Sequence, residues 1–230
     1  MPAQLSVIDS LQETLARHGP VGCAERLLRV ACRHARETLR VREQHIWYQM
    51  RLDASLPYCA LPDGYECLRG GMESVPLLSN LGALGFVEAQ RRLGSGSAEL
   101  WMLVKNGRAA GACWIFHGRT PVRAARGGWL SLPADGVCLE DTVTAAEHRG
   151  LGLAPAAWLH IARVQMRAGM RFVVTKVAAN NLASHRAVQK AGFHPIARMN
   201  FERTFLRRRI GIEADGDVRS AAFLLDQLAS

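Results

Sequence analysis

The chain has 230 residues, 49% of them hydrophobic, and a formal net charge of +9 at pH 7. This length suits one domain with a substantial core and an appendage. No apolar run approaches the ~18 residues of a membrane span, and no charged start leads into an apolar export segment. Its six cysteines form no CxxC pair and no zinc-ligand spacing with histidine, so we expect no metal. We expect a soluble cytoplasmic protein whose cysteines are buried, reduced thiols.

Arginine supplies most of the positive charge, since lysine occurs only at positions 105, 176 and 190. A basic chain suits a polyanionic ligand or an acidic partner protein. Nucleic acid is the rival partner. It is disfavoured because the arginines are spread along the chain and no nucleic-acid-binding signature is recognisable.

The N-terminal residues 5–40 have a helical pattern that Gly19-Pro20 divides in two. In the second helix an arginine stripe adjoins the apolar face, which indicates a helix packed on a core with its charges in solvent. Docking of an acidic carrier protein, a dimer contact and a membrane surface are the alternatives. A strand is predicted at residues 46–52, followed by a loop at 57–64 that we take as the domain boundary.

The middle of the chain predicts a short strand at residues 65–69 and a helix in two pieces over 73–93, broken near Gly82. Strands at 99–104 and 109–117 flank Asn106-Gly107, a specific hairpin-turn signal. Another strand-like patch follows Arg126, and the last strand of this region covers residues 137–144.

The remaining pattern predicts a helix at residues 155–168, a strand at 172–177 and a helix at 183–191. Strands near 196–201 and 204–206 follow, and then a helical tail over 214–229. We therefore divide the chain into an N-terminal helical extension with one strand (1–60), a mixed α/β domain (61–210) and a C-terminal helical tail (211–230).

The most informative stretch is the turn from Arg149 to Ala154, which reads Arg-Gly-Leu-Gly-Leu-Ala. It joins a β-branched strand end to a helix. The first N–H groups of a helix have no internal partner, and the helix dipole adds partial positive charge there. Gly150 and Gly152 let the backbone approach an anion that a Cβ would block. We expect phosphate, most simply a pyrophosphate, on this turn.

The order Arg-x-x-Gly-x-Ala between a strand and a helix resembles motif A of the GNAT acyltransferases. Further on, residues 181–193 read Asn-Leu-Ala-Ser-His-Arg-Ala-Val-Gln-Lys-Ala-Gly-Phe, which is similar to motif B of the same family, most closely in its ribosomal-protein N-terminal and polyamine acetyltransferase branch. The resemblance covers roughly residues 64–208 and implies the GNAT fold, a mixed central sheet, with acetyl-CoA or another acyl-CoA as co-substrate and no metal.

The resemblance also implies which residues hold the acyl-CoA. In this family the strand before motif A parts from its neighbour, and its unpaired N–H groups hold the pantetheine and the thioester carbonyl. That assigns Thr142, Val143 and Thr144 to the thioester by their backbone, and Asn181 to the pantetheine by its amide. The pyrophosphate would lie on the turn formed by Arg149, Gly150, Leu151, Gly152, Leu153 and Ala154.

Acyl transfer to an amine needs a base for the amine, and the nearest carboxylates are Glu140 and Asp141. Strand alternation places Glu140 on the face of Thr142 and Thr144, with Asp141 opposite, so we favour Glu140 as the catalytic base. A bulge in this strand would exchange the two faces.

The general acid differs from the commoner family pattern. Many members carry a tyrosine seven residues after the motif B asparagine, but this chain has Val188, which cannot donate a proton. In the branch that this motif B resembles, the serine acts as the donor, which implicates Ser184. A serine near a helix start is also a routine capping residue.

These observations favour an N-acyltransferase that moves an acetyl or other acyl group from acyl-CoA to a primary amine of a small molecule, an amino sugar or a peptide. Arg119, Arg123 and Arg126 with Trp129 would suit an anionic acceptor. Two alternatives stay open: an acyltransferase that takes its acyl group from acyl-carrier protein or a longer acyl-CoA, and a non-catalytic protein that binds acyl-CoA. A homodimer is compatible with each.

Overall fold

The computed structural model of the protein describes residues 40–82, 85–204 and 207–229. The helices predicted within residues 5–39, and with them the arginine stripe, lie outside the described residues. The chain divides into two compact units, one comprising residues 1–42 and 201–209 and the other 43–200 and 210–230. In the described part of the first unit, Arg40 donates two hydrogen bonds to Glu202, at 2.9 and 2.6 Å. The candidate site lies within the second unit.

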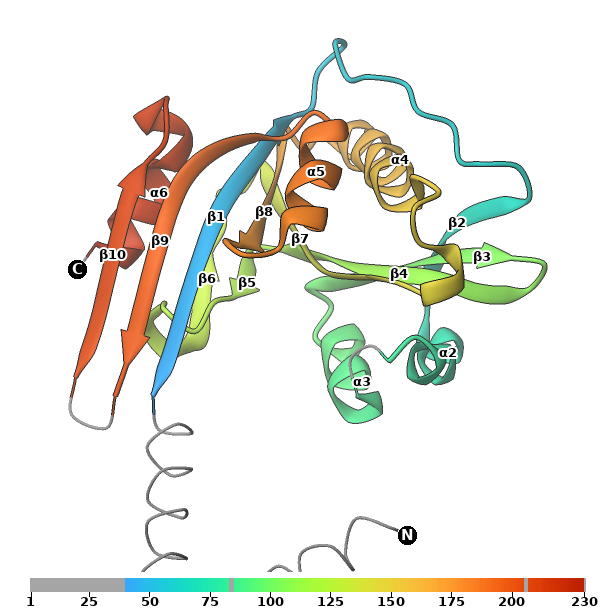
Figure 1. The fold of residues 1–230 in the computed structure, drawn as a ribbon, viewed down its shortest axis with the longest axis horizontal. Coiled ribbons are helices and arrows are strands. Elements are labelled where there is room, and N and C mark those ends of the chain that lie inside the picture. The colour runs from blue at the N-terminus through green and yellow to red at the C-terminus, as the bar shows by residue number, and fades with distance from the viewer. Residues whose placement is uncertain (1–39, 83–84, 205–206, 230) are drawn as a thin grey trace, which may run out of the picture. The chain divides into compact units, whose positions relative to one another are not determined.

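Ten strands are described, eight of which form one mixed sheet in the order β10-β9-β1-β8-β7-β4-β3-β2 while β5 and β6 pair separately (Figure 1). Their bounds are β1 Val41–Arg51, β2 Tyr65–Gly70, β3 Ala98–Lys105, β4 Arg108–His117, β5 Arg119–Pro121, β6 Trp129–Ser131, β7 Gly136–Thr144, β8 Phe172–Ala178, β9 His194–Arg203 and β10 Arg208–Ala214. The mixed sheet is the fold class that the sequence predicts, and it is confirmed.

Five α-helices are described: α2 Val75–Asn80, α3 Phe86–Gly94, α4 Leu153–Arg167, α5 Leu182–Lys190 and α6 Val218–Leu228. The pieces α2 and α3 flank Gly82, as the sequence predicts. Helices α4 and α5 lie next to each other over the middle of the sheet, and α2 and α3 lie on the other side of β3 and β4 (Figure 1). Apolar side chains of β1, β7 and β8 pack under α4 in one buried cluster that includes Tyr48, Leu139 and Trp158.

The hairpin predicted at Asn106-Gly107 joins β3 to β4. Both turn residues have positive φ, 50° for Asn106 and 73° for Gly107, which is the conformation of a two-residue hairpin turn and the reason that these residue types are found there. The tail helix α6 begins after Asp217, whose side chain accepts a hydrogen bond from the Arg219 N–H at 3.1 Å.

Strand β1 holds a position that the sequence analysis did not anticipate. It pairs antiparallel with β8, with His45 opposite Ala178 and Arg51 opposite Phe172, and lies between β8 and β9. From its sequence this strand was expected in an N-terminal extension, but it is an inner strand of the sheet. Its side chains can therefore reach any site formed at β8.

The two parallel strands β7 and β8 pair only along their first halves. Their partners run from Gly136 with Phe172 to Leu139 with Thr175. Beyond that point β7 stays paired with β4, up to Thr144 opposite Gly111, while β8 stays paired with β1. The strands therefore part after Leu139, as the resemblance to the GNAT acyltransferases implies.

The last strand of the sheet was not predicted from the sequence. The sequence suggested a strand at residues 204–206. Thr204 lies after the end of β9, and its N–H donates to the Arg207 carbonyl at 2.8 Å. Residues 205–206 lie outside the described residues. The strand is β10, Arg208–Ala214. Ile210, Ile212 and Ala214 alternate along it, but Gly211 lies between the two isoleucines, and glycine in a strand interior weakens the strand signal.

Glu99 on β3 is a partly buried carboxylate with four partners. It accepts hydrogen bonds from Arg69 (3.0 Å), Trp101 (3.1 Å), Gln165 (3.0 Å) and, through the imidazole, His117 (3.2 Å). Burial alone would raise the pKa of Glu99, but the hydrogen bonds from His117 and Trp101 outweigh it, so this pKa lies below the usual 4.5. The carboxylate links β2, β3, β4 and α4.

We expect Glu99→Gln to lower the free energy of unfolding at pH 7 by about 1–3 kcal/mol, since several donors lose a charged acceptor. A carboxyl with a depressed folded pKa stabilises the fold above its unfolded pKa, and that stability is lost as the pH falls through the folded pKa. Urea unfolding of both proteins should therefore show a difference in stability at neutral pH that closes as the pH falls through the folded pKa of Glu99, below 4.5. A difference that stays constant with pH would contradict this role of the charge.

Candidate active site

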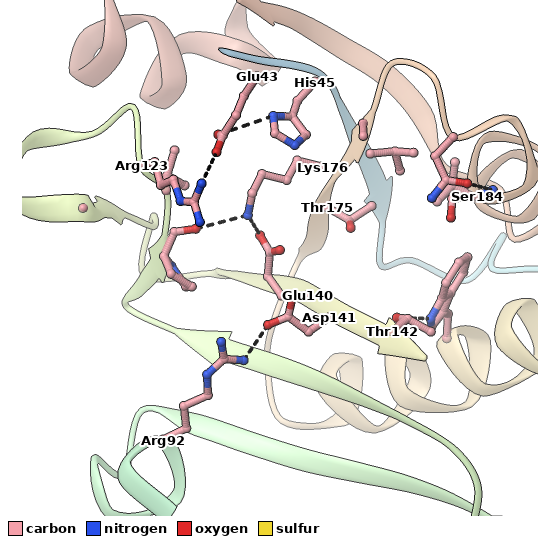
Figure 2. A pocket seen from close by; sticks show the side chains of 18 residues that line it. Glu43, His45, Arg92, Arg123, Glu140, Asp141, Thr142, Thr175, Lys176 and Ser184 are labelled. Atoms are coloured by element: carbon pink, nitrogen blue, oxygen red, sulfur yellow. Dashed lines mark hydrogen bonds and ion pairs between the residues drawn. The ribbon is translucent and has the colours of Figure 1, made fainter. Parts of the chain in front are cut away.

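A pocket of about 600 Å³ opens where β7 and β8 part. Its walls come from β1, β7, β8, three helices and the segment after β5 (Figure 2). On the side of α4 and α5 it is lined by Thr142, Trp158, Asn181, Ser184 and Val188. The rest of its lining is strongly charged and includes Glu43, His45, Arg92, Arg123, Glu140, Asp141 and Lys176.

A bulge in β7 sets which side chains face which part of the pocket. Trp114 of β4 is opposite Glu140, but Ala112 is opposite Val143, so the register shifts between these pairs. Asp141 has a φ of 47° in the bulge, a conformation that aspartate tolerates better than most residues. The extra residue reverses the alternation of the strand from this point on.

The predicted parity of β7 is therefore wrong. Glu140 and Thr142 were expected on one face, but the Trp158 Nε1–H of α4 donates to Thr142 Oγ1 at 3.1 Å, whereas Glu140 accepts a hydrogen bond from Thr120 of β5 at 3.4 Å. Asp141, expected opposite Glu140, also turns away from α4 and contacts α3 through Arg92. The cause is the bulge, in which two residues of β7 stand opposite one residue of β4.

Glu140 and Lys176 form a buried ion pair at the point where the strands part (Figure 2). Their side chains are 8% and 15% exposed. Burial alone would lower the pKa of the Lys176 ammonium, but the Glu140 carboxylate more than compensates, so this pKa is raised. Lys176 also donates to the Pro121 carbonyl at 3.1 Å, which ties β8 to the end of β5.

The other two pocket carboxylates are also paired with cations. Arg92, almost wholly buried on α3, donates to Asp141 at 2.7 Å and to Glu88 at 3.0 Å. Its guanidinium lies over the Trp114 and Phe116 rings, which fixes its position. Arg123 donates to Glu43 at 3.2 Å. The charged part of the pocket is thus made of three ion pairs and His45.

Helix α5 begins at the pocket with the Asn181 side chain as its cap. Asn181 Oδ1 accepts from the Ser184 N–H at 3.1 Å, while the Asn181 amide NH₂ has no hydrogen-bond partner among the described residues. Ser184 lines the pocket at the first turn of the helix, and Val188, 1% exposed, lines it one turn later. The sequence had left a cap as the alternative role of Ser184, but here the capping side chain is Asn181.

The glycine turn lies at the start of α4. Gly150 and Gly152 have φ values of 79° and 74°, and no side chain caps the N-terminus of the helix. Arg149 holds the turn against the end of β7, where its Nε donates to the Thr144 carbonyl at 3.1 Å. A Cβ added at Gly152 would lie 3.5 Å from Lys190 Nζ, so an ammonium from the end of α5 stands beside the turn. The turn thus combines uncapped N–H groups, a helix dipole and a cation, which favours a phosphate.

The pocket brings together five of the predicted site residues, which are Glu140, Asp141, Thr142, Asn181 and Ser184. Val143 and Thr144 continue β7 beside it, and the turn at 149–154 lies beyond the pocket lining, at the start of α4. The resemblance pointed to these backbone segments, and the structure arranges them along the parted strand and the adjoining helix.

Four functional candidates were missed: Glu43, His45, Lys176 and Lys190. Glu43 and His45 are two apart and so share a face of β1, but the strand was predicted to begin at Ile46. Lys176 is the one charged residue of the strand Phe172–Ala178, and a lone charge in a mostly buried strand was a usable signal. Arg119 lies over the Trp129 ring at 4.7 Å, and Arg126 is absent from the pocket lining, so of the three loop arginines Arg123 alone reaches the pocket.

Three further observations concern metal ligands, the Cys138 thiol and membrane helices. No group of three or more His, Cys, Asp or Glu side chains among the described residues is placed to hold a metal ion. Burial, and then the Glu140 charge, raise the pKa of the Cys138 thiol well above its ordinary value, which disfavours a thiolate nucleophile at this position. Within the same ranges no helix is long and apolar enough to cross a membrane.

The parted parallel strands, the bulge and the glycine turn before α4 together define an acyl-CoA N-acyltransferase fold. Residues 75–193 match the sequence model of the Acetyltransferase (GNAT) family. That match covers more than half of the chain, which therefore belongs to the GNAT family. Comparison with curated proteins gives no match.

Solved structures support the fold. A GNAT-family protein from Novosphingobium aromaticivorans aligns with a TM-score of 0.50 and 17% identity, over 70% of this chain and 63% of that protein. A protein from Drosophila gives 0.53 and 14%, over 80% and 57%. A GCN5-related N-acetyltransferase from Sphaerobacter thermophilus gives 0.50 and 16%, over 89% and 67%. The chain thus spans less than two thirds of the first two structures, and at these identities the likeness concerns the fold alone.

Proposed function

We propose that the protein is an N-acyltransferase that moves an acetyl or other acyl group from acyl-CoA to a primary amine of a small molecule, an amino sugar or a peptide. The observation that carries the proposal is the parting of β7 and β8 beside an uncapped, glycine-containing helix start. This leaves N–H groups of one strand beside the pocket, in line with a turn that suits a pyrophosphate.

The residues on the α4 and α5 side of the pocket can be matched to the parts of an acyl-CoA donor. The turn at 149–154 and Lys190 would hold the pyrophosphate, and the unpartnered Asn181 NH₂ would reach the pantetheine. Backbone N–H groups of Thr142, Val143 and Thr144 would then face the thioester carbonyl. In this arrangement they stabilise the negative charge that develops on the carbonyl oxygen during attack.

In the reaction, the amine nitrogen attacks the thioester carbon and the carbon–sulfur bond breaks. A base takes the proton that the nitrogen releases, and the CoA thiolate leaves with or without protonation. We propose Ser184 as the proton donor, because it lines the pocket one helical turn before Val188, where other members carry tyrosine. Glu140 and Asp141 stay predictions as the base, and each is already paired with a cation.

The acceptor side does not favour one sign of charge. Its three cations are each paired with a carboxylate, so these side chains give the pocket no excess of positive or negative charge. The structure therefore adds no support for an anionic acceptor. A primary amine with hydroxyl or amide groups can form hydrogen bonds to such paired charges. It therefore fits the pocket as well as an anionic amine does.

A thiol-release assay tests the proposal. Acetyl-CoA is supplied with a panel of primary amines that includes polyamines, amino sugars and N-terminal peptides, and free CoA is measured. Amine-dependent release is expected, with Ser184→Ala lowering kcat by about 10-fold or more at saturating substrates. Replacing acetyl-CoA by longer acyl-CoA or by acyl-carrier protein identifies the donor. Tight binding of acetyl-CoA without release for any amine would favour a non-catalytic protein.

A further inference from the structure

We infer that His45 of β1 is the general base of the acyl transfer, oriented by Glu43; the inference rests on the proposed function. This assignment concerns a strand that lies outside the residues matched to the family, 75–193. It begins from the insertion of β1 beside β8, which brings His45 opposite Ala178, just beyond the point where β8 leaves β7.

The surroundings of His45 leave one ring nitrogen for the pocket. Nδ1 is buried, has no hydrogen-bond partner among the described residues, and lies 4.0 Å from Glu43 Oε2. His45 nevertheless lines the pocket, which leaves Nε2 as the nitrogen that can face it (Figure 2). With its proton on Nδ1 toward Glu43, the imidazole presents the Nε2 lone pair to an entering amine.

Glu43 is itself held in place. Arg123 donates to Glu43 Oε1 at 3.2 Å while Oε2 faces the imidazole, so the carboxylate bridges the two side chains. A separation of 4.0 Å is long for a hydrogen bond, but catalytic contacts are often loose before the substrate binds. A carboxylate behind an imidazole fixes the tautomer of the ring and stabilises the imidazolium that forms.

The other candidates for the base are less available. Glu140 is in a buried ion pair with Lys176, and Asp141 accepts from Arg92 at 2.7 Å. An amine that used either would have to displace a cation already in place. His45 carries no such partner.

The charges around His45 keep it ready to accept a proton. They are Glu43 on the same strand, Lys176 on β8, Glu140 on β7 and Arg123 after β5. Burial first, and then the Lys176 ammonium, lower the pKa of His45 below 6.5, while Glu43 acts in the opposite direction. The imidazole is therefore neutral at pH 7, as a base must be before the reaction.

The step balances without a further reactant. The amine nitrogen forms a bond to the thioester carbon, the nitrogen's proton passes to His45 Nε2, and the electrons of the broken carbon–sulfur bond leave on the CoA thiolate. The imidazolium then returns its proton to water, or to the thiolate by way of Ser184, which passes on one proton and regains one. This resets the base for the next turnover.

The test is the pH dependence of kcat, measured with saturating acetyl-CoA and the amine that turns over fastest in the thiol-release panel. The wild type should show a limb that rises with pH and has its midpoint below 6.5, because protonated His45 cannot act as base. His45→Gln should lower kcat by about 100-fold or more and lose this limb. Glu43→Gln should shift the limb to lower pH, since Glu43 raises the pKa of His45.

His194→Gln is the matched control, because the His194 pKa is also lowered, chiefly by burial, but this histidine does not line the pocket. It should keep the wild-type rate and limb. Acetyl-CoA affinity by calorimetry should be the same in His45→Gln and wild type, which excludes misfolding. Imidazole added to His45→Ala should restore part of the rate.

Several outcomes would overturn the inference. If His45→Gln keeps the rising limb and a kcat within about threefold of wild type, His45 is not the base, but the proposed N-acyltransferase function still stands. Loss of the limb in Glu140→Gln rather than in His45→Gln would assign the base to Glu140. A wild type that acetylates no amine would overturn both the proposed function and this inference.

Discussion

Gly152→Glu is expected to weaken acetyl-CoA binding by about 100-fold or more, because it places a carboxylate where the phosphates are proposed to lie. The new side chain would also point toward Lys190 and neutralise the nearby ammonium, 3.5 Å from the Cβ position. Both effects remove attraction for an anion at the start of α4. Calorimetric titration with acetyl-CoA measures the loss directly.

Gly169→Glu is a closely matched control. Gly169 also has a positive φ, 89° against 74° for Gly152, so both substitutions impose the same kind of backbone strain. It follows the other end of α4, and no atom lies within 4 Å of its Cβ position. It should bind acetyl-CoA like the wild type. Equal losses in the two variants would mean that strain or net charge, rather than the phosphate turn, explains the effect.

Lys176→Met is expected to lower the free energy of unfolding by about 3–5 kcal/mol, because it leaves the buried Glu140 carboxylate without its cation. Both side chains are mostly buried, at 15% and 8% exposed, so water from the pocket replaces the missing partner only in part. Urea unfolding at pH 7, followed by circular dichroism, measures the change.

The double variant Lys176→Met/Glu140→Gln separates charge from packing. With both charges removed no unpaired ion is buried, and most of the lost stability should return. The amide that replaces the Glu140 carboxylate can still accept the hydrogen bond that Thr120 donates at 3.4 Å. A double variant as unstable as Lys176→Met would show that the lysine stem, rather than the ion pair, is what the fold requires.

Most of the helices and strands could be predicted because the signals that specify them lie within short stretches of the sequence. Asn106-Gly107 predicted the β3–β4 hairpin from turn chemistry alone, and the glycine turn before α4 predicted a helix start. The order of these elements then gave the sheet through resemblance to a known family.

The position of β1 could not be predicted in this way. Its pairing with β8 joins segments far apart in the sequence, and apolar alternation does not specify the partner of a strand. The Glu43–His45 pair was missed for the same reason, because the pairing of β1 with β8 is what places these two side chains at the pocket.

The faces of Glu140, Asp141 and Thr142 depended on the bulge. Alternation assumes one residue opposite one residue, and the register shift in β7 breaks that assumption at Asp141. Residue types alone do not reveal such a shift. Contacts to α3, α4 and β8 were needed to assign the three side chains.

Hydrogen exchange of the backbone amides with and without acetyl-CoA tests the central claim most directly, because the proposed ligands are the N–H groups themselves. Acetyl-CoA should slow exchange at residues 142–144, in the turn at 149–154 and at the start of α5, while the β2–β3 edge of the sheet stays unchanged. Protection at the parted strand and the turn together would place the thioester and the pyrophosphate as proposed. No protection there at a saturating concentration, or protection confined to another surface, would contradict the account.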